Sequence, residues 1–322
     1  MKAAFFRRYG PPEVLEYGEL PDPAPARGEV LVDIHAVSVN AADWKQRAGQ
    51  YPAKVALPHI PGRDFSGVVA AVGEGARDFQ PGDAVFGVCE VPAESAYAEK
   101  IALRQEIVGR KPERFSHVEC AAAGLAALTA LVSIEDTLQV KAGETVLIHG
   151  ASGGVGVAAT QIARANGLRV IATAGTERGM NLARQHGAHE VLNHRDGNYL
   201  NRVTPLTGGR GVDLVLEMLA NVNLDRDLDV LAFRGRVMVV GNRGRIEIDP
   251  RKIMSKDGAI LGMTMFNATA DEYRTIHAAL APGLENGSLT PVIGREMPLD
   301  QAVQAHGAVM ESGAFGKIVL VP

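Results

Sequence analysis

Residues 149–156, HGASGGVG, have the composition of a phosphate-binding turn. They stand between a short apolar run, TVLI, and a segment whose apolar residues have helical spacing, and this context makes a glycine-rich turn informative. Gly153 would let the backbone approach a pyrophosphate, and Gly156 would let the helix pack closely on the strand. Ala151 replaces the first glycine of the usual G-x-G-x-x-G pattern. The turn therefore predicts a dinucleotide site, with a tight turn that binds nothing as the alternative.

The next strand, RVIATAG, ends at Gly175 without a carboxylate. Sites that prefer NAD place Asp or Glu at this point, where it holds the ribose 2′-hydroxyl. Without that carboxylate a 2′-phosphate is not repelled, and Thr176, Arg178 and Arg195 are candidate donors to it. The neighbouring Glu177 complicates this interpretation, and the alternative is that the two arginines only decorate loops. The pattern predicts NADPH as the cofactor.

The elements that must position these residues follow from periodicity. From about residue 140 to 266, short apolar runs alternate with helical segments, which is typical of βαβ units and a parallel sheet. Residues 1 to about 120 are rich in short strands, and residues 28–39 alternate apolar and polar in the period of a half-buried strand. After residue 266 we expect a helix that begins with the capping box of Thr269 and Glu272 and ends near Pro282. The final run, KIVLV, is expected to return to the sheet of the first domain.

Composition excludes several classes of protein. The chain has 322 residues and a formal net charge of −4, which gives no electrostatic case for a dedicated nucleic-acid binder. Its two cysteines imply no disulfide framework. The apolar stretch at the start is too short for a signal peptide, and residues 120–134 are too few for a membrane span, so we expect a buried helix there and a cytoplasmic protein.

Longer stretches carry a family resemblance. Residues 67–75, GVVAAVGEG, with the PGDAV that follows at residues 81–85, look like the signature of the medium-chain dehydrogenase/reductase superfamily. Together with GASGGVG, GAHEVLNHRD, LEMLANVNL and VVGNRG, the whole chain resembles the zinc-free, zeta-crystallin type of NADPH:quinone oxidoreductase. The resemblance implies an α/β protein with a GroES-like, β-rich catalytic domain over residues 1–122 and 267–322. A Rossmann domain, a doubly wound parallel sheet that binds NADPH, would occupy residues 123–266.

The resemblance also implies the residues that contact NADPH. Arg178 and Arg195 join them as candidate donors to the 2′-phosphate. The implied contacts are Tyr51, Ser152, Gly153, Gly154, Val155, Gly175, His194, Asn223, Val240, Gly241, Asn242, Arg243, Met263, Thr264 and Met265.

No metal is expected. Zinc enzymes of the superfamily supply a Cys, then a Gly-His-Glu, then a second Cys or Asp, but this chain has Asn40 in the first position and Gly-Arg-Asp at residues 62–64. Two cysteines more than 30 residues apart cannot build the structural zinc site either. Three histidines at positions 186, 189 and 194 have metal-like spacing, but they fall across a helix end and a strand.

Asn40, Asp43 and Tyr51 are the candidates for catalytic or substrate-positioning groups, with turn contacts and packing as their alternative roles. No convincing general acid is present, which favours a quinone, because a simple ketone needs a Lewis acid or an acid catalyst. We expect NADPH-dependent reduction of quinones, ortho-quinones above all, in a homodimer or homotetramer. The alternatives are reduction of α,β-unsaturated aldehydes or ketones, and a non-enzymatic role as an AU-rich RNA binder or a lens-type structural protein.

Overall fold

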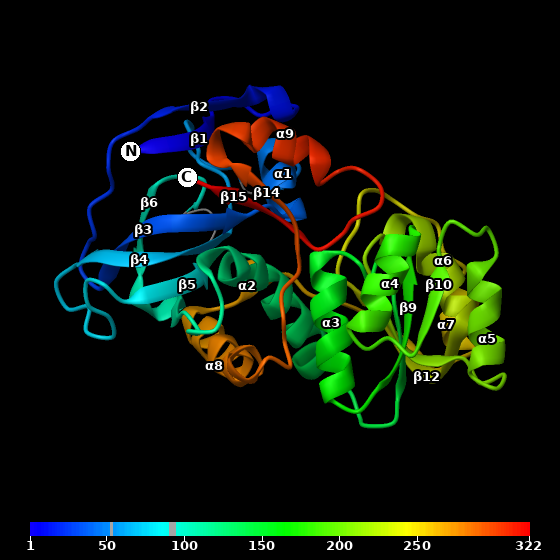
Figure 1. The fold of residues 1–322 in the computed structure, drawn as a ribbon. Helices are drawn as coiled ribbons and strands as arrows, with labels where there is room; N and C mark the ends of the chain where they lie inside the picture. Colours follow the sequence, from blue (N-terminus) through cyan, green and yellow to red (C-terminus); the bar gives the residue numbers. More distant parts are fainter. Residues whose placement is uncertain (52–53, 90–94) are drawn as a thin grey trace. The chain divides into compact units, whose positions relative to one another are not determined.

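The computed structural model describes residues 1–51, 54–89 and 95–322 of the chain (Figure 1). These residues form two compact units. The first unit contains Met1–Ala126, Phe266–Glu311 and Gly316–Pro322, and the second contains Ala127–Met265 with the short segment Ser312–Phe315. The chain therefore leaves the first unit for the second and returns to it.

The described part of the first unit contains a seven-stranded sheet with the order β14-β15-β3-β4-β5-β7, in which β6 also pairs with β3. Its strands are β3 (Glu29–Ser38), β4 (Asp64–Val72), β5 (Ala84–Val88), β6 (Lys100–Arg104), β7 (Val108–Arg110), β14 (Ile293–Pro298) and β15 (Lys317–Val321). A separate antiparallel pair consists of β1 (Lys2–Phe6) and β2 (Leu15–Glu19). The last strand, β15, pairs antiparallel with β3, which confirms the expectation that KIVLV returns to the first sheet.

Helices complete this unit. They are η1 (Pro12–Val14), α1 (Ala41–Arg47), η2 (Gln105–Ile107), α2 (His117–Leu131), η5 (Met265–Asn267), α8 (Ala270–Asn286), η6 (Leu299–Gln301) and α9 (Ala302–Ala308). The capping box at Thr269 and Glu272 is confirmed, but the expected end of α8 near Pro282 is wrong. The helix continues to Asn286, because Leu280 and Leu284 are buried on either side of the proline and packing outweighs one lost backbone hydrogen bond.

Helix α2 continues into a π-helical turn, η3 (Val132–Thr137). The span His117–Thr137 is long and apolar enough to cross a membrane, but 67% of its most apolar window is buried inside the protein, which is typical of a core helix. The expected buried helix at residues 120–134 is therefore present.

The second unit contains a parallel sheet of six strands within the described residues, in the order β10-β9-β8-β11-β12-β13. This is the doubly wound order of a Rossmann domain, as expected. The strands are β8 (Thr145–Ile148), β9 (Arg169–Ala174), β10 (Glu190–Asn193), β11 (Val212–Glu217), β12 (Leu231–Val239) and β13 (Ala259–Gly262). The helices are α3 (Gly154–Ala165), α4 (Glu177–Gln185), η4 (Tyr199–Arg202), α5 (Val203–Leu206), α6 (Ala220–Val230) and α7 (Pro250–Met254).

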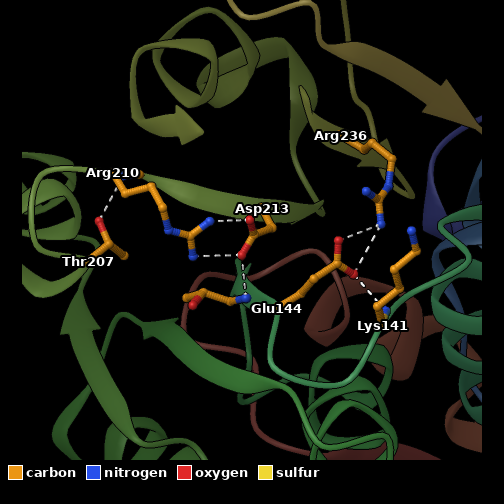
Figure 2. Close-up of polar contacts among 8 residues, drawn as sticks. Lys141, Glu144, Thr207, Arg210, Asp213 and Arg236 are labelled. Atoms are coloured by element: carbon orange, nitrogen blue, oxygen red, sulfur yellow. Dashed lines mark hydrogen bonds and ion pairs between the residues drawn. The ribbon is translucent and has the colours of Figure 1, made fainter. Parts of the chain in front are cut away.

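Ion pairs tie together the amino ends of three neighbouring strands of this sheet (Figure 2). Arg210 makes a two-pronged pair with Asp213 of β11, whose Oδ2 also accepts a hydrogen bond from the Thr145 backbone N–H of β8 at 2.7 Å. Arg236 of β12 donates to Glu144 Oε1, just before β8, at 3.1 Å. These contacts link the strands at the amino edge of the sheet. Because all its strand pairs are parallel, the loops that follow the strands emerge at the opposite edge.

Candidate functional site

A buried carboxylate organises the first unit. Asp64 is fully buried at the start of β4, and its Oδ2 accepts hydrogen bonds from the Ser38 hydroxyl and, at 2.7 Å, from Asn40 Nδ2. Its Oδ1 accepts from the Leu125 backbone N–H. The Lys317 ammonium lies 3.6 Å from Oδ2. An ionised carboxylate can be buried at tolerable cost only with such a set of donors and a counter-charge.

Helix α2 bends to reach this carboxylate. Gly124 has non-helical backbone angles, and a Cβ at this position would lie 2.4 Å from Asp64 Oδ1. The residue must therefore be glycine. The bend also points the Leu125 N–H at Asp64.

Lys317 is the residue that sequence reasoning missed. It opens β15, is only 7% exposed, and its Nζ donates to Asn40 Oδ1 as well as facing Asp64. Burial lowers the pKa of Lys317, against the opposing charges of Asp64 and Asp43. The available signal was a lysine at the start of an otherwise apolar buried strand.

The structure brings Asn40 and Asp43 together, and it gives both of them structural partners. Asp43 Oδ2 accepts from the Asn40 backbone N–H at 2.8 Å and from the Tyr97 hydroxyl at 3.1 Å. Burial raises the pKa of the Asp43 carboxyl to about 7. Both amide hydrogens of Asn40 are used, one by Asp64 and the other by the Ser38 carbonyl at 3.3 Å. The turn contacts considered as the alternative role are therefore present.

Tyr51 lies within electrostatic range of the same group. Burial raises the pKa of Tyr51 to about 12, and the Asp43 charge contributes in the same direction. The phenol therefore stays protonated through the neutral range and remains a hydrogen-bond donor.

The donor set around Asn40 does not fit a zinc ion. Asp64 offers a carboxylate, but Asn40 offers an amide, and the Lys317 ammonium occupies the space between their oxygens. A protonated amine has no electron pair for a metal, and it repels a divalent cation. In this network Lys317 supplies the positive charge.

The predicted cofactor residues other than Tyr51 belong to the second unit. All of them follow the carboxyl ends of its strands, as ligand-binding loops of doubly wound sheets do. The segment after β8 contains Ser152, Gly153, Gly154 and Val155; that after β9 contains Gly175 and Arg178; that after β10 contains His194 and Arg195; that after β11 contains Asn223; that after β12 contains Val240, Gly241, Asn242 and Arg243; and that after β13 contains Met263, Thr264 and Met265. The sheet therefore collects them at one edge.

The glycine turn is built for close approach. Gly156 packs so tightly on the turn that a Cβ would lie 2.4 Å from the Gly150 carbonyl oxygen. Gly153 is the N-cap residue of α3, and a glycine has no side chain to cap this end of the helix. A Cβ at Gly153 would meet only ordinary contacts at 3.5 Å or more. The amino end of α3 is thus open to an anion, with its N–H groups and dipole available. This geometry fits a dinucleotide pyrophosphate.

The region expected to hold a 2′-phosphate contains a second element that the sequence did not reveal. The segment 312–315 lies here, since the Arg178 guanidinium stacks 3.6 Å above the Phe315 ring and the Ser152 hydroxyl donates to the Ala314 carbonyl at 2.7 Å. A Cβ on Gly313 would lie 3.8 Å from an Arg195 guanidinium nitrogen. Ser152 can therefore offer a ligand its backbone, because its hydroxyl is already bonded.

Two further residues define this region. A Cβ on Gly175 would come within 2.5 Å of His194 Nε2, so only glycine fits beside that imidazole. Glu177, the complication noted above, has a 71% exposed side chain whose carboxylate lies 3.6 Å from Arg184 on the same helix. Its charge is therefore turned toward another arginine and largely solvated.

Comparison with known proteins agrees with this architecture. A family described as the alcohol dehydrogenase GroES-like domain matches residues 26–141, and one described as zinc-binding dehydrogenase matches residues 154–281. The human quinone oxidoreductase is 44% identical over 323 residues, covering 100% of this chain and 98% of the relative.

Solved structures are similar over the full length. The quinone oxidoreductase of Escherichia coli complexed with NADPH superposes with a TM-score of 0.91 at 28% identity, covering 100% of both chains. A protein described as an NAD-dependent alcohol dehydrogenase gives a TM-score of 0.92 at 34% identity, also with full coverage. The protein is thus an enzyme with a GroES-like and a Rossmann domain, and it belongs to the quinone oxidoreductase family of medium-chain dehydrogenases/reductases.

Proposed function

We propose that this enzyme reduces quinones with NADPH and without zinc, and that it prefers ortho-quinones. The observation that carries the proposal is the Lys317–Asn40–Asp64 network, in which a buried ammonium contacts Asn40, the residue that stands at the first zinc-ligand position by resemblance. A site of this kind has no Lewis acid to polarise a simple ketone, whereas a quinone accepts hydride without strong activation. The full-length relatives named quinone oxidoreductase support the same substrate class.

NADPH is proposed as the cofactor, and the missing carboxylate after β9 supports it. Arg178 and Arg195 supply positive charge beside the 312–315 segment, and Thr176 caps α4 by accepting from the Gly179 N–H at 3.0 Å. The open amino end of α3 would hold the pyrophosphate, and the loops after β11 and β12 the nicotinamide half. When bound, NADPH supplies a hydride, and the quinone takes up this hydride and a proton to become a hydroquinone.

The residues around the acceptor act by positioning. We propose that the Tyr51 ring packs against the quinone and that its hydroxyl donates to a quinone oxygen, because the phenol stays protonated at neutral pH. Asn40 and Asp43 are proposed to hold the floor of the site, since their polar atoms are bonded to Asp64, Lys317 and Tyr97. The proton of the product hydroquinone comes from solvent or a neighbouring donor.

Removal of metal should leave the activity intact. We expect NADPH oxidation by a quinone to continue at its full rate after dialysis against a chelator, because Lys317 replaces the metal charge. Elemental analysis of the purified protein should find substoichiometric zinc. One tightly bound zinc per chain, lost together with activity on chelation, would contradict this prediction.

Arg195→Ala should weaken NADPH selectively. Loss of one charge-assisted phosphate contact costs about 1.5–3 kcal/mol, or roughly 10- to 150-fold in Kd. The measurement is Kd for NADPH and for NADH by fluorescence titration. Arg251→Ala is the control, since the side chain of this arginine on α7 is 91% exposed and pairs with Asp249, so both values should stay unchanged. Equal losses for the two cofactors would remove the phosphate role of Arg195.

Quinones should outperform enals. We expect a higher kcat/KM for 1,2-naphthoquinone than for a medium-chain 2-alkenal at the same pH, because the site can position a flat ring but cannot strongly activate a weak acceptor. Tyr51→Ala should lower kcat/KM for the quinone more than Asp43→Asn does, and Tyr51→Phe separates the hydroxyl from the ring. An alkenal preference of tenfold, about 1.4 kcal/mol, would replace the quinone reductase with an enone reductase.

A homodimer or homotetramer is proposed from the edge of the second sheet. Strand β13 ends the strand order, and its Ile260 is 37% exposed, so an apolar edge is available for pairing. Light scattering at micromolar concentration should give a dimer or tetramer mass, and Ile260→Lys should reduce it. Met254→Lys, at a 70% exposed position on α7, is the control. A monomeric wild type would refute the proposal.

A further inference from the structure

A buried polar cluster lies in the second unit at the carboxyl ends of β8 and β11. His149 is 3% exposed, and Glu217 and Asp227 are fully buried. His149 Nε2 lies 2.8 Å from Asp227 Oδ1 and 3.4 Å from Glu217 Oε2. One donor atom of each residue lies within 4.8 Å of the others. Two carboxyl groups and an imidazole thus share a buried site.

Glu217 connects this cluster to the loops that follow two strands. Its backbone carbonyl accepts from the Val240 and Gly241 N–H groups at 2.9 and 3.1 Å. Its Oε1 accepts from the Leu219 backbone N–H and, at 3.2 Å, from Asn223 Nδ2. The proposed nicotinamide-binding residues after β11 and β12 are therefore bonded to one glutamate.

These two loops are also packed on each other. The Ala220 N–H donates to the Gly241 carbonyl at 3.0 Å, and a Cβ on Gly241 would lie 2.1 Å from the Met218 carbonyl oxygen. His149, which immediately precedes the glycine turn, donates its backbone N–H to the Leu216 carbonyl at 3.1 Å. A displacement of Glu217 would therefore be transmitted to several cofactor loops together.

The charges around the cluster favour one bound proton. Burial raises the pKa of Glu217 to about 7, and the hydrogen bond to Asp227 adds to the rise. Burial also raises the pKa of Asp227 and lowers that of His149, so the imidazole is neutral and donates to Asp227. A protonated Glu217 can then donate to the same carboxylate.

The other groups that face the cluster do not neutralise two carboxylates. Tyr199 of η4 lies edge-on to the His149 ring at a centroid distance of 6.1 Å, and the Arg226 guanidinium of α6 stacks on Tyr199 at 5.5 Å. His194, after β10, interacts electrostatically with His149. Arg226 is exposed, so its charge is shared with solvent.

We propose that Glu217 is a positioning residue for the nicotinamide half of NADPH, and that one proton held between Glu217 and Asp227 keeps its side chain on the 219–223 turn. The inference rests on the proposed function, because it requires NADPH to contact the loops after β11 and β12. Loss of the proton places two negative charges side by side in a buried site, and their repulsion moves Glu217 away from the turn.

The raised pKa of Glu217 determines how the protein responds to pH. A carboxyl whose pKa is raised on folding contributes its stability below the ordinary value of 4.5, and that contribution is lost as the pH rises through about 7. Because the proposal couples NADPH binding to the protonated form of Glu217, NADPH affinity should decrease above neutral pH. If binding requires the proton, the Kd for NADPH rises by at most about tenfold per pH unit.

The experiment is a fluorescence titration of NADPH Kd between pH 6 and 9. We expect the affinity of the wild type to decrease by about tenfold from pH 7.5 to 8.5, the one-proton limit. Glu217→Gln keeps an acceptor for the turn and a permanent donor to Asp227, so its Kd should change less than about twofold over the same range. Asp227→Asn removes the second carboxyl and should flatten the profile too. Asp225→Asn changes a half-buried carboxyl of the same helix, which pairs with Lys252 outside the cluster, and should retain the wild-type slope.

The 2′-phosphate of NADPH also titrates, but it affects the wild type and every variant alike. The difference between their profiles of Kd against pH therefore reports the contribution of the His149–Glu217–Asp227 cluster alone. Equal pH slopes in the wild type, Glu217→Gln and Asp227→Asn would overturn the proposal. A stoichiometric metal that is lost in both variants would also overturn it, since a cation would then replace the proton. A wild type that binds no NADPH at any pH would refute the proposed function itself, and thermal melting of each variant separates unfolding from a local effect.

Discussion

The burial of Asp64 is the constraint on which the first unit depends. A carboxylate without solvent needs several donors and a positive charge nearby, and each requirement determines a residue elsewhere. Ser38 and Asn40 supply donors at the end of β3, and Gly124 breaks α2 so that the Leu125 N–H can reach Oδ1. Lys317 brings the charge from the last strand. The return of β15 to the first sheet is thus tied to the chemistry of the site.

The second unit meets a different requirement, which is to bring distant loops to one edge. A parallel sheet does this because every strand ends at the same side, and the ion pairs of Asp213 and Glu144 fix the opposite side. Glycines at 156 and 241 then allow backbones to approach within distances that a Cβ would forbid. The result is a rigid frame with open helix and loop N–H groups at the carboxyl edge.

Both polar clusters contain buried carboxyl groups, and they differ in the groups that surround those carboxyls. In the first unit the Lys317 ammonium lies 3.6 Å from the Asp64 carboxylate and compensates its charge. In the second unit, the described groups around Glu217 and Asp227 include no buried ammonium or guanidinium, and burial raises the pKa of both carboxyls. The first network thus places an amine beside its buried carboxylate, whereas in the second we propose that a shared proton takes that role.

The sequence alone determined the features that depend on local spacing. Alternating apolar runs and helices predicted the Rossmann sheet, the glycine turn predicted the open end of α3, and Asn40 with Arg63 indicated that the zinc ligands are missing. Local rules failed at Pro282, where buried leucines carry α8 onward. Only the tertiary structure paired Lys317 with Asn40, 277 residues away, placed residues 312–315 beside Arg178, and joined His149, Glu217 and Asp227. Periodicity reports which face of an element is buried, but the partner of a buried charge is decided by which distant segments the fold brings into contact.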